Sequence, residues 1–256
     1  MTTRLSMLAL PMLILAPLGA QDDFLDTGPM SLVIQYHCAP YRRAQLRQAM
    51  TGNGLATFEQ AKTHGILSGY RVLFSRYADT EHWDMQALLS FRKYDDVVRW
   101  GFVERNGLAG LPMEAVAQSI TAIESYPADL VREKAAPAVL EHPVYLVVPY
   151  RISTPAQYFV QFIDGYERPQ LDAWAEEGIL AGYGFYMQRY TAGRPWDSLA
   201  VLEFKDDPSL GAREKTAAKV RQALQSSQGW QQWDRGAGNT RVEQAAVIAD
   251  ELGRDR

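Results

Sequence analysis

The sequence predicts an α+β protein built from two similar units in tandem, each with the element order β-α-β-β-α-β. Two observations lead to this fold class. First, the string GILSGYRVLFSRY at residues 65–77 recurs as GILAGYGFYMQRY at residues 178–190. Second, each string stands at the same point in a series of strand-like and helix-like apolar patterns. A repeat at a fixed separation is typical of a duplicated architecture.

The repeat extends without a gap over residues 65–94 and 178–207, with twelve identical pairs. About two identities would be expected from average residue usage. The pairs include Gly69 and Gly182, Arg76 and Arg189, and the Trp-Asp dipeptides at 83–84 and 196–197. Weaker similarity on both sides gives a first unit over residues 29–138 and a second unit over residues 139–256.

The second unit shows the predicted elements more clearly. Residues 144–152 are rich in valine and tyrosine and have the length of a strand. Thr154 and Pro155 are then typical of a helix start. Apolar residues between positions 158 and 166 recur with helical spacing. A second helical piece is expected from Pro169 to Gly178, because glycine commonly ends a helix.

Residues 183–190 and 196–205 read as two strands of a hairpin with a short turn-rich loop. An amphipathic helix is expected over 207–225 and a weak strand over 240–246. The first unit repeats this order, with its first helix broken at residues 51–54. The order is that of the ferredoxin-like split βαβ unit. Its sheet has helices on one face only, so two units can cover each other's bare face.

This organisation resembles the dimeric α+β barrel superfamily in a fused, tandem form, over nearly all of the chain after residue 28. That superfamily includes antibiotic-biosynthesis-type and haem-degrading monooxygenases, muconolactone isomerase-like enzymes, chlorite dismutases and dye-decolourising peroxidases. The resemblance implies two sheets that pair as an intramolecular barrel. It also implies one ligand pocket in each unit, between the sheet and its helices, and haem ligation by a histidine of one half.

The N-terminal residues predict export. Arg4, an apolar run over residues 5–18 and Gly19-Ala20 form a signal-peptide pattern over residues 1–20. A membrane anchor is the alternative, but a spanning helix needs about 20 apolar residues. Residues 21–28 are a linker in this interpretation. We therefore expect a periplasmic or secreted protein without a membrane span after cleavage.

The composition excludes several other classes of function. Cys38 is the only cysteine, so the chain has no internal disulfide and no zinc site built on cysteines. The net charge of −4 comes without a basic block, which disfavours nucleic acid as a partner. The glycines match no phosphate-binding loop, and no metal-binding or nucleophile motif is present.

Candidate ligand-binding residues lie on the repeated strand. Tyr70 and Arg76 share one face of that strand, as do Tyr183 and Arg189, because alternate strand residues point the same way. A guanidinium beside aromatic rings can hold a carboxylate or a phenolate. The alternative is a structural salt bridge at the strand end, with Asp84 or Asp197 as the partner.

Four histidines are present, and none recurs in the other unit. His37 and His64 are candidate ligand-binding residues and possible axial ligands of haem, although a lone histidine is more often structural. In the alignment of the two units, His37 is expected to correspond to Pro149 or Tyr150. His37 and Cys38 are neighbours on a strand and point to opposite faces, so they do not form a catalytic pair. No cofactor other than haem is suggested.

The absence of a catalytic motif favours a non-catalytic function. We expect an exported fused barrel that binds a small apolar or aromatic molecule or a protein partner, as a monomer with an internal pseudo-dimer. One alternative is an oxidoreductase, either a cofactor-independent monooxygenase or a haem enzyme, with one active half. Another is a structural role in the envelope. An asymmetric function should lie where the copies differ, as at Arg71/Gly184, His64/Glu177 and His82/Pro195.

Overall fold

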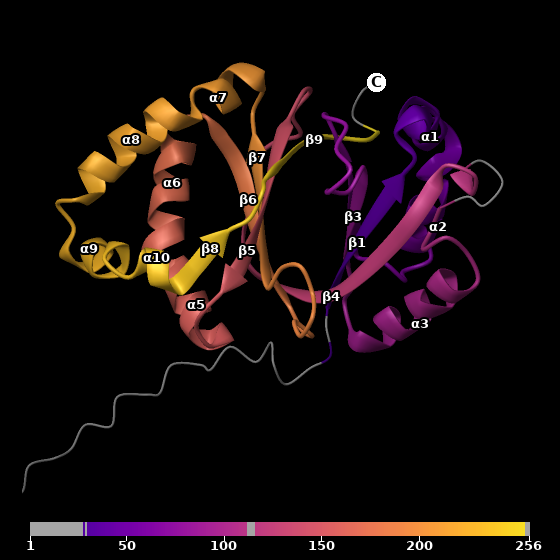
Figure 1. Ribbon diagram of the computed structural model, residues 1–256, viewed down its shortest axis with the longest axis horizontal. Coiled ribbons are helices and arrows are strands. Elements are labelled where there is room, and N and C mark those ends of the chain that lie inside the picture. Colours follow the sequence, from indigo (N-terminus) through magenta and orange to yellow (C-terminus); the bar gives the residue numbers. More distant parts are fainter. Residues whose placement is uncertain (1–27, 29, 112–115, 254–256) are drawn as a thin grey trace, which may run out of the picture.

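The computed structural model describes residue 28, residues 30–111 and residues 116–253. The predicted signal peptide and all but the last residue of the predicted linker lie outside this part of the chain. The described strands form one nine-stranded sheet in the order β7-β6-β4-β1-β3-β2-β9-β5-β8, and β5 also pairs with β7. The sheet therefore closes into a ring, with helices on two opposite sides of it (Figure 1).

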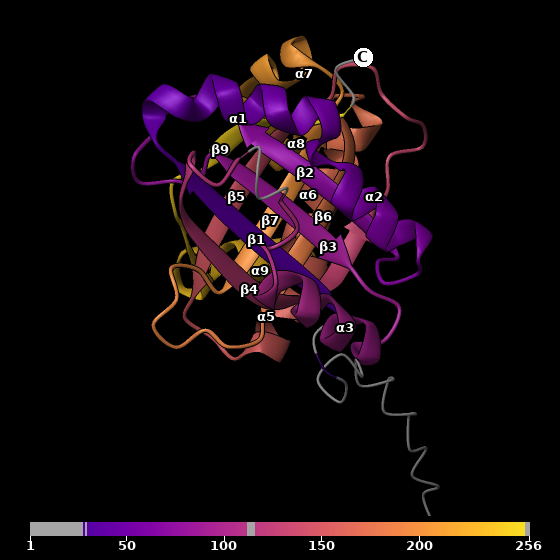
Figure 2. The same cartoon turned by 90° about the vertical axis from the view of Figure 1, so that its right-hand side faces the viewer.

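Within the described residues, the first half supplies four strands of the ring and three α-helices. Its elements are β1 (Ser31–Cys38), η2 (Pro40–Arg42), α1 (Arg43–Ala49), η3 (Met50–Gly54), α2 (Ala56–Thr63), β2 (Gly69–Ser75), β3 (Met85–Ser90), α3 (Tyr94–Arg105) and β4 (Ile120–Lys134). The break expected at residues 51–54 is a π-helical turn between α1 and α2. The three α-helices lie across the outer face of these strands (Figure 2).

The second half begins with a strand at the predicted residues. Its elements are β5 (Val144–Ile152), α5 (Ala156–Phe162), η4 (Ile163–Glu167), α6 (Arg168–Glu176), β6 (Leu180–Gln188), β7 (Ser198–Phe204), α7 (Asp207–Gly211), α8 (Arg213–Leu224), α9 (Gln228–Asp234), α10 (Ala237–Thr240), β8 (Arg241–Glu243) and β9 (Val247–Glu251). The single helix expected over 207–225 is two helices, and the weak last strand is also two. The prediction missed α9 and α10. None of the described helices is long and apolar enough to cross a membrane.

The last strand of each half joins the two halves. β4 pairs with β1 through residues 120–128 and continues along β6 through residues 128–134. In the same way β9 pairs with β5 of its own half and with β2 of the first half. Every pairing is antiparallel, and the exchange of these strands closes the ring without leaving its main strands as open edges.

Apolar side chains form three cores. One lies between the first half's strands and its helices, and one lies in the same place in the second half. The third fills the ring itself and contains inward-pointing residues of both halves, including Val33, Leu73, Tyr145 and Val201. Trp83 and Trp196 belong to this third core and are almost fully buried.

The repeated arginines hold the two halves together. Arg76 Nε donates to Asp250 Oδ1 on β9 at 2.7 Å, and Arg189 forms an ion pair with Asp129 on β4. Each arginine therefore pairs with the terminal strand of the other half. The alternative expectation of a structural salt bridge is correct as to the type of interaction. Its expected partners are wrong, because Asp84 and Asp197 bond to other groups.

The carboxylates of Asp84 and Asp197 each accept a hydrogen bond from the backbone at the end of the first strand of their half. Asp84 Oδ2 accepts a hydrogen bond from the Cys38 backbone N–H at 2.6 Å, and Asp197 Oδ2 accepts one from the Ile152 N–H at 2.8 Å. Strand register agrees with this equivalence, since Tyr36 pairs with Met85 and Tyr150 with Ser198. His37 is thus equivalent to Arg151, and the expected alignment with Pro149 or Tyr150 is wrong.

The repeated glycines offer a matched test of close packing. A Cβ on Gly182 would lie 2.7 Å from the Lys134 carbonyl oxygen, whereas one on Gly69 would have no heavy atom within 4 Å. We expect Gly182→Ala to lower the free energy of unfolding by about 1–3 kcal/mol, a typical cost of overpacking. Gly69→Ala should change it by no more than about 0.5 kcal/mol. Urea unfolding of both variants checks this, and equal losses would contradict it.

Candidate functional site

Two cavities lie at opposite ends of the ring. The hairpin-end cavity, where β1 and β5 end and both hairpins turn, has a volume of about 770 Å³. Its walls include Gln35, His37, Trp83, Glu124, Arg194 and Trp196. The linker-end cavity, of about 360 Å³, is lined by Arg71, Tyr183, Gly184, Tyr186, Glu203 and residues 133–139 before β5. Both volumes are in the range of small-molecule sites.

These positions differ from the expectation of one pocket per unit. The cavity between the sheet and helices of the second half, lined by Tyr150, Glu167 and Trp174 among others, has only about 60 Å³. Equivalent residues of the two halves meet in the hairpin-end cavity, as Trp83 does with Trp196 and His82 with Pro195. This cavity is therefore shared by both halves.

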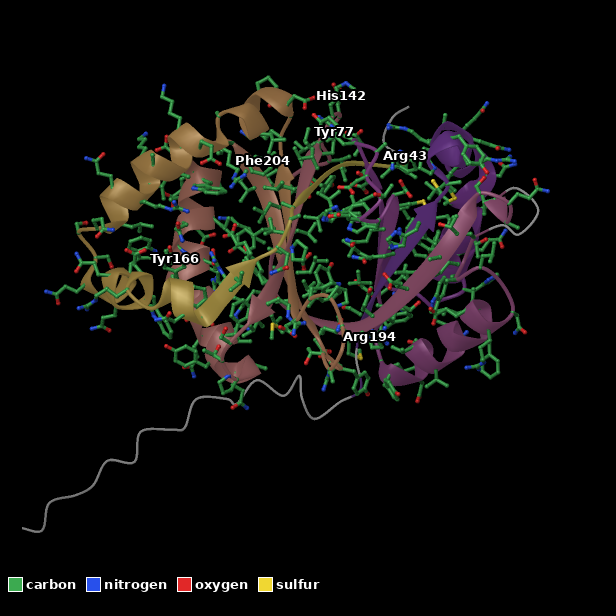
Figure 3. The ribbon with its side chains drawn as sticks, in the orientation of Figure 1. Arg43, Tyr77, His142, Tyr166, Arg194 and Phe204 are labelled. Carbon is green, nitrogen blue, oxygen red and sulfur yellow. The ribbon has the colours of Figure 1, made fainter. Side chains whose placement is uncertain are left out.

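Aromatic rings form part of the hairpin-end cavity. The Trp196 ring lies 5.1 Å from that of Tyr126, measured between centroids. The Arg194 guanidinium lies 5.4 Å from the centroid of the same tyrosine ring. Arg194 itself is on the loop between β6 and β7, at the lower edge of the sheet in Figure 3. A planar ligand at this end would meet both indole surface and a cation.

A polar chain of three residues lies on the first half's side of this cavity. His37 Nε2 is 3.5 Å from Glu124 Oε2, and that oxygen also accepts a hydrogen bond from the Tyr126 hydroxyl at 2.9 Å. The pKa of the Tyr126 hydroxyl is raised far above its ordinary value, mainly because the side chain is buried. The phenol therefore stays protonated at neutral pH and donates to Glu124, which in turn faces the imidazole.

Two amides extend this polar wall into the ring. Gln35 Nε2 donates to Gln86 Oε1 at 2.9 Å, and Gln86 is fully buried. Gln86 Nε2 has no hydrogen-bond partner among the described residues. Buried polar groups are usually satisfied, so this donor is an exception, but Gln86 is not among the residues that line the cavity. Strand register and the repeat make Pro149 and Leu199 the equivalents of these glutamines, so the fold does not need amides there.

The structure places the predicted site residues in different locations. His37 is on the wall of the hairpin-end cavity, and Tyr183 is on the wall of the linker-end cavity. Arg76 and Arg189 join the halves. Tyr70 lies on the helix side of β2, where its hydroxyl donates to Glu59 at 2.9 Å. His64 is exposed at the end of α2.

Sequence reasoning missed Glu124, Tyr126, Gln35 and Gln86. One signal was available for the glutamine on β1, because Gln35 and His37 are alternate polar residues in an otherwise apolar strand. Alternation also places Cys38 on the other face, in the core beneath the first half's helices, as expected. No signal in the sequence shows that Glu124 would pair with β1.

The layer between the sheet and the helices of the second half does not fit a haem. In the second half it is filled by Phe159, Phe162, Tyr166, Trp174 and Trp230, which leave only the cavity of about 60 Å³. No histidine is among the described residues that line this cavity. The described chain also has no cluster of three or more His, Cys, Asp or Glu side chains that could hold a metal ion.

This packing predicts that the protein does not take up haem. Titration of the purified protein with hemin should give no Soret band beyond that of free hemin. Two histidines, His37 and His82, lie on a large cavity, but His37 Nε2 faces Glu124 and His82 Nδ1 lies 2.6 Å from Asp79 Oδ2. A sharp Soret band that disappears in the His37→Ala variant would contradict this prediction.

Comparison with known proteins supports the fold. No family model matches the chain, and no curated protein matches its sequence. Among solved structures, a monooxygenase-like protein from Fusobacterium nucleatum is 11% identical with a TM-score of 0.54, and the match covers 88% of this chain and 93% of that one. A haem-binding protein from Thermus thermophilus is 11% identical with a TM-score of 0.52, over 90% of this chain and 93% of that one.

A dye-decolorizing protein from V. cholerae is 12% identical with a TM-score of 0.50, over 89% of this chain and 95% of that one. These neighbours are dimeric α+β barrel proteins, which is the class that the sequence analysis suggested. The present chain is a mixed α+β protein of that fold class, with a large antiparallel sheet. At such low identities the likeness shows the fold and no activity.

Proposed function

We propose that this protein binds a small aromatic molecule with a hydroxyl group, such as a phenol or a quinol, in the hairpin-end cavity. The observation that carries the proposal is one cavity of about 770 Å³ between the halves, with tryptophans of both copies and with most of its polar groups from the first copy. Trp83 and Trp196 line the cavity on its apolar side, with only a small part of each ring exposed. His37, Glu124 and Gln35 offer hydrogen bonds to its hydroxyl.

The difference between the halves supports ligand binding over a structural role. A ring that served only as scaffold could be apolar throughout, as it is at Pro149 and Leu199. Burying polar groups without full pairing costs free energy. The first half nevertheless places an imidazole, a carboxylate and two amides at this end, which suits recognition of a polar group on an otherwise apolar ligand.

Binding can be followed through the tryptophans of the cavity. We expect phenols and naphthols to change the intrinsic fluorescence with saturation, and cyclohexanol of similar size to bind at least tenfold more weakly. The reason is that a saturated ring gains no aromatic stacking, which is worth about 0.5–1.5 kcal/mol for each pair. No saturable change with any aromatic member of the panel would refute the proposed function.

A second candidate is oxidation of such a ligand by dioxygen without a cofactor. The observation that favours it is the imidazole of His37 beside Glu124, which can accept the hydroxyl proton and retain it as a paired imidazolium. Oxygen consumption with a panel of quinols, compared with the rate of their unassisted oxidation, tests this candidate. Equal rates with and without protein would refute oxidation and leave ligand binding as the only proposed function.

We further infer how the chain is built and where it acts. Residues 29–138 and 139–256 are proposed as two ferredoxin-like units, because both have strands and helices in the order β-α-β-β-α-β. The strand exchange makes the fused pair self-sufficient, which favours a monomer. The pattern at residues 1–20 supports export to the periplasm or the medium, and N-terminal sequencing of the exported protein tests the cleavage.

A further inference from the structure

A group of charged and aromatic side chains lies inside the ring at the linker-end cavity. Arg71 Nη2 lies 3.2 Å from Glu203 Oε2, and Arg71 Nε lies 3.6 Å from Glu251 Oε2. The guanidinium also lies 4.9 Å from the centre of the Tyr145 ring. Tyr145 in turn donates its hydroxyl to Glu251 at 2.5 Å. Arg71 is therefore held from three sides.

The duplication provides an internal comparison for this group. The repeat and the strand register identify the equivalent residue in the other half for each member of the group. These are Gly184 for Arg71, Ser31 for Tyr145, Ser90 for Glu203 and Leu130 for Glu251. None of them is charged. The fold thus forms without such a group, whereas burying charges is costly. A binding role is the better explanation, and Arg71 and Gly184 line the same cavity.

Two hydrogen-bond donors of this cavity are not used within the part of the chain that the structure describes. Arg71 Nη1 has no hydrogen-bond partner among the described residues, and the Arg71 side chain is 33% exposed. The Tyr186 hydroxyl donates to no described residue either. Burial raises the pKa of Tyr186 to about 12, so the phenol is a donor at neutral pH. Both side chains line the cavity, beside Tyr183 and Val201.

The charges around these donors select the kind of ligand. Glu203 and Glu251 both contact Arg71. Glu133 and Lys134 add one charge of each sign to the same cavity, so the group as a whole is not positive. An anion would meet the repulsion of two nearby carboxylates, and a cation would meet the guanidinium. An uncharged ligand with an acceptor oxygen avoids both costs and still satisfies the two donors.

We propose that the linker-end cavity binds an uncharged carbonyl compound. Its oxygen accepts hydrogen bonds from Arg71 Nη1 and the Tyr186 hydroxyl, and its apolar part lies against Tyr183 and Val201. This site is separate from the hairpin-end cavity and does not depend on the function proposed for it. The chemical class is that of a ketone, a quinone or an amide.

Three probes of similar size and different charge test the proposal: benzamide, benzoate and benzylamine. Ligand-observed NMR titration of the purified protein should show saturable binding of benzamide. Benzoate and benzylamine should bind at least tenfold more weakly. Tighter binding of either ion than of benzamide would overturn the proposal, and so would the absence of binding by all three.

Variants locate the benzamide site. Tyr186→Phe keeps the ring and removes one donor, so benzamide should bind about fivefold to tenfold more weakly, as expected for one lost hydrogen bond. Arg71→Met should abolish the preference for benzamide over benzylamine. If Arg71→Met does not fold, Tyr186→Phe still decides. His37→Ala, in the other cavity, should leave benzamide binding unchanged. Loss in His37→Ala with no loss in Tyr186→Phe would overturn the proposal.

Discussion

Replacing Arg189 with methionine will lower the free energy of unfolding by about 3 kcal/mol or more. The ion pair of Arg189 with Asp129 is nearly buried, with 13% and 6% of the two side chains exposed. Removing one member of a buried pair leaves an uncompensated charge, which typically costs about 3–5 kcal/mol. Because this pair joins β6 to the terminal strand of the other half, the loss should appear in a single cooperative transition.

The equivalent arginine is the matched control. Arg76 pairs with Asp250, and both side chains are more exposed than their counterparts, at 23% and 20%. We expect Arg76→Met to cost about 1 kcal/mol, because exposed pairs contribute little. Urea unfolding of both variants measures the difference. The double variant Arg189→Met/Asp129→Leu should regain part of the stability lost in Arg189→Met, because it leaves no unpaired buried charge. Equal losses in Arg189→Met, Arg76→Met and the double variant would contradict this explanation.

Replacing His37 with alanine will weaken binding of phenolic ligands by about tenfold or more. The imidazole and Glu124 are two of the polar groups that the first half adds to the hairpin-end cavity, and they lie next to each other. A hydrogen bond to a charged or polarised partner contributes about 1.5–3 kcal/mol, and 1.4 kcal/mol corresponds to a factor of ten in affinity. Isothermal titration calorimetry with a phenol selected from the panel measures the change.

The duplication again supplies the control. Arg151 occupies the position equivalent to His37, but its side chain bonds to the Arg194 carbonyl at 2.7 Å and to Asp197. We therefore expect Arg151→Ala to leave the affinity within about twofold of the original protein. Circular dichroism should show that both variants are folded. Equal losses in the two variants would mean that the ligand does not use the His37 side of the cavity.

Much of the fold could be predicted because it depends on local patterns. The strand over 144–152 follows from its valines and tyrosines, and Gly178, with φ of 81°, follows the helix that it was expected to end. The repeat of residues 65–94 in 178–207 identified the duplication. These features require only neighbouring residues, so a single sequence contains them.

The joining of the halves could not be predicted in the same way. Arg76 and Asp250 are 174 positions apart, and their pairing depends on β9 crossing to β2. Asp84 was the nearer candidate partner in the sequence. It instead accepts from the Cys38 N–H, because the end of β1 leaves that donor without a strand partner. Long-range register decided both outcomes.

The candidate site was predictable only in part. Arg71 and Gly184, one of the pairs at which the copies differ, both line the linker-end cavity, and a function there stays a prediction. The resemblance suggested pockets beneath the helices, but aromatic residues such as Phe162 and Trp174 fill that layer in the second half. Side-chain volume across a layer depends on packing in three dimensions, and periodicity does not reveal it.

Ligands are expected to bind at the ends of the ring, between the halves. Crystals soaked with small phenols and with benzamide test this most directly. We predict electron density for a phenol at the hairpin-end cavity, in contact with Trp83 or Trp196 and with its hydroxyl near His37 or Glu124. Density found instead between the sheet and its helices, with both ends of the ring empty, would contradict the account.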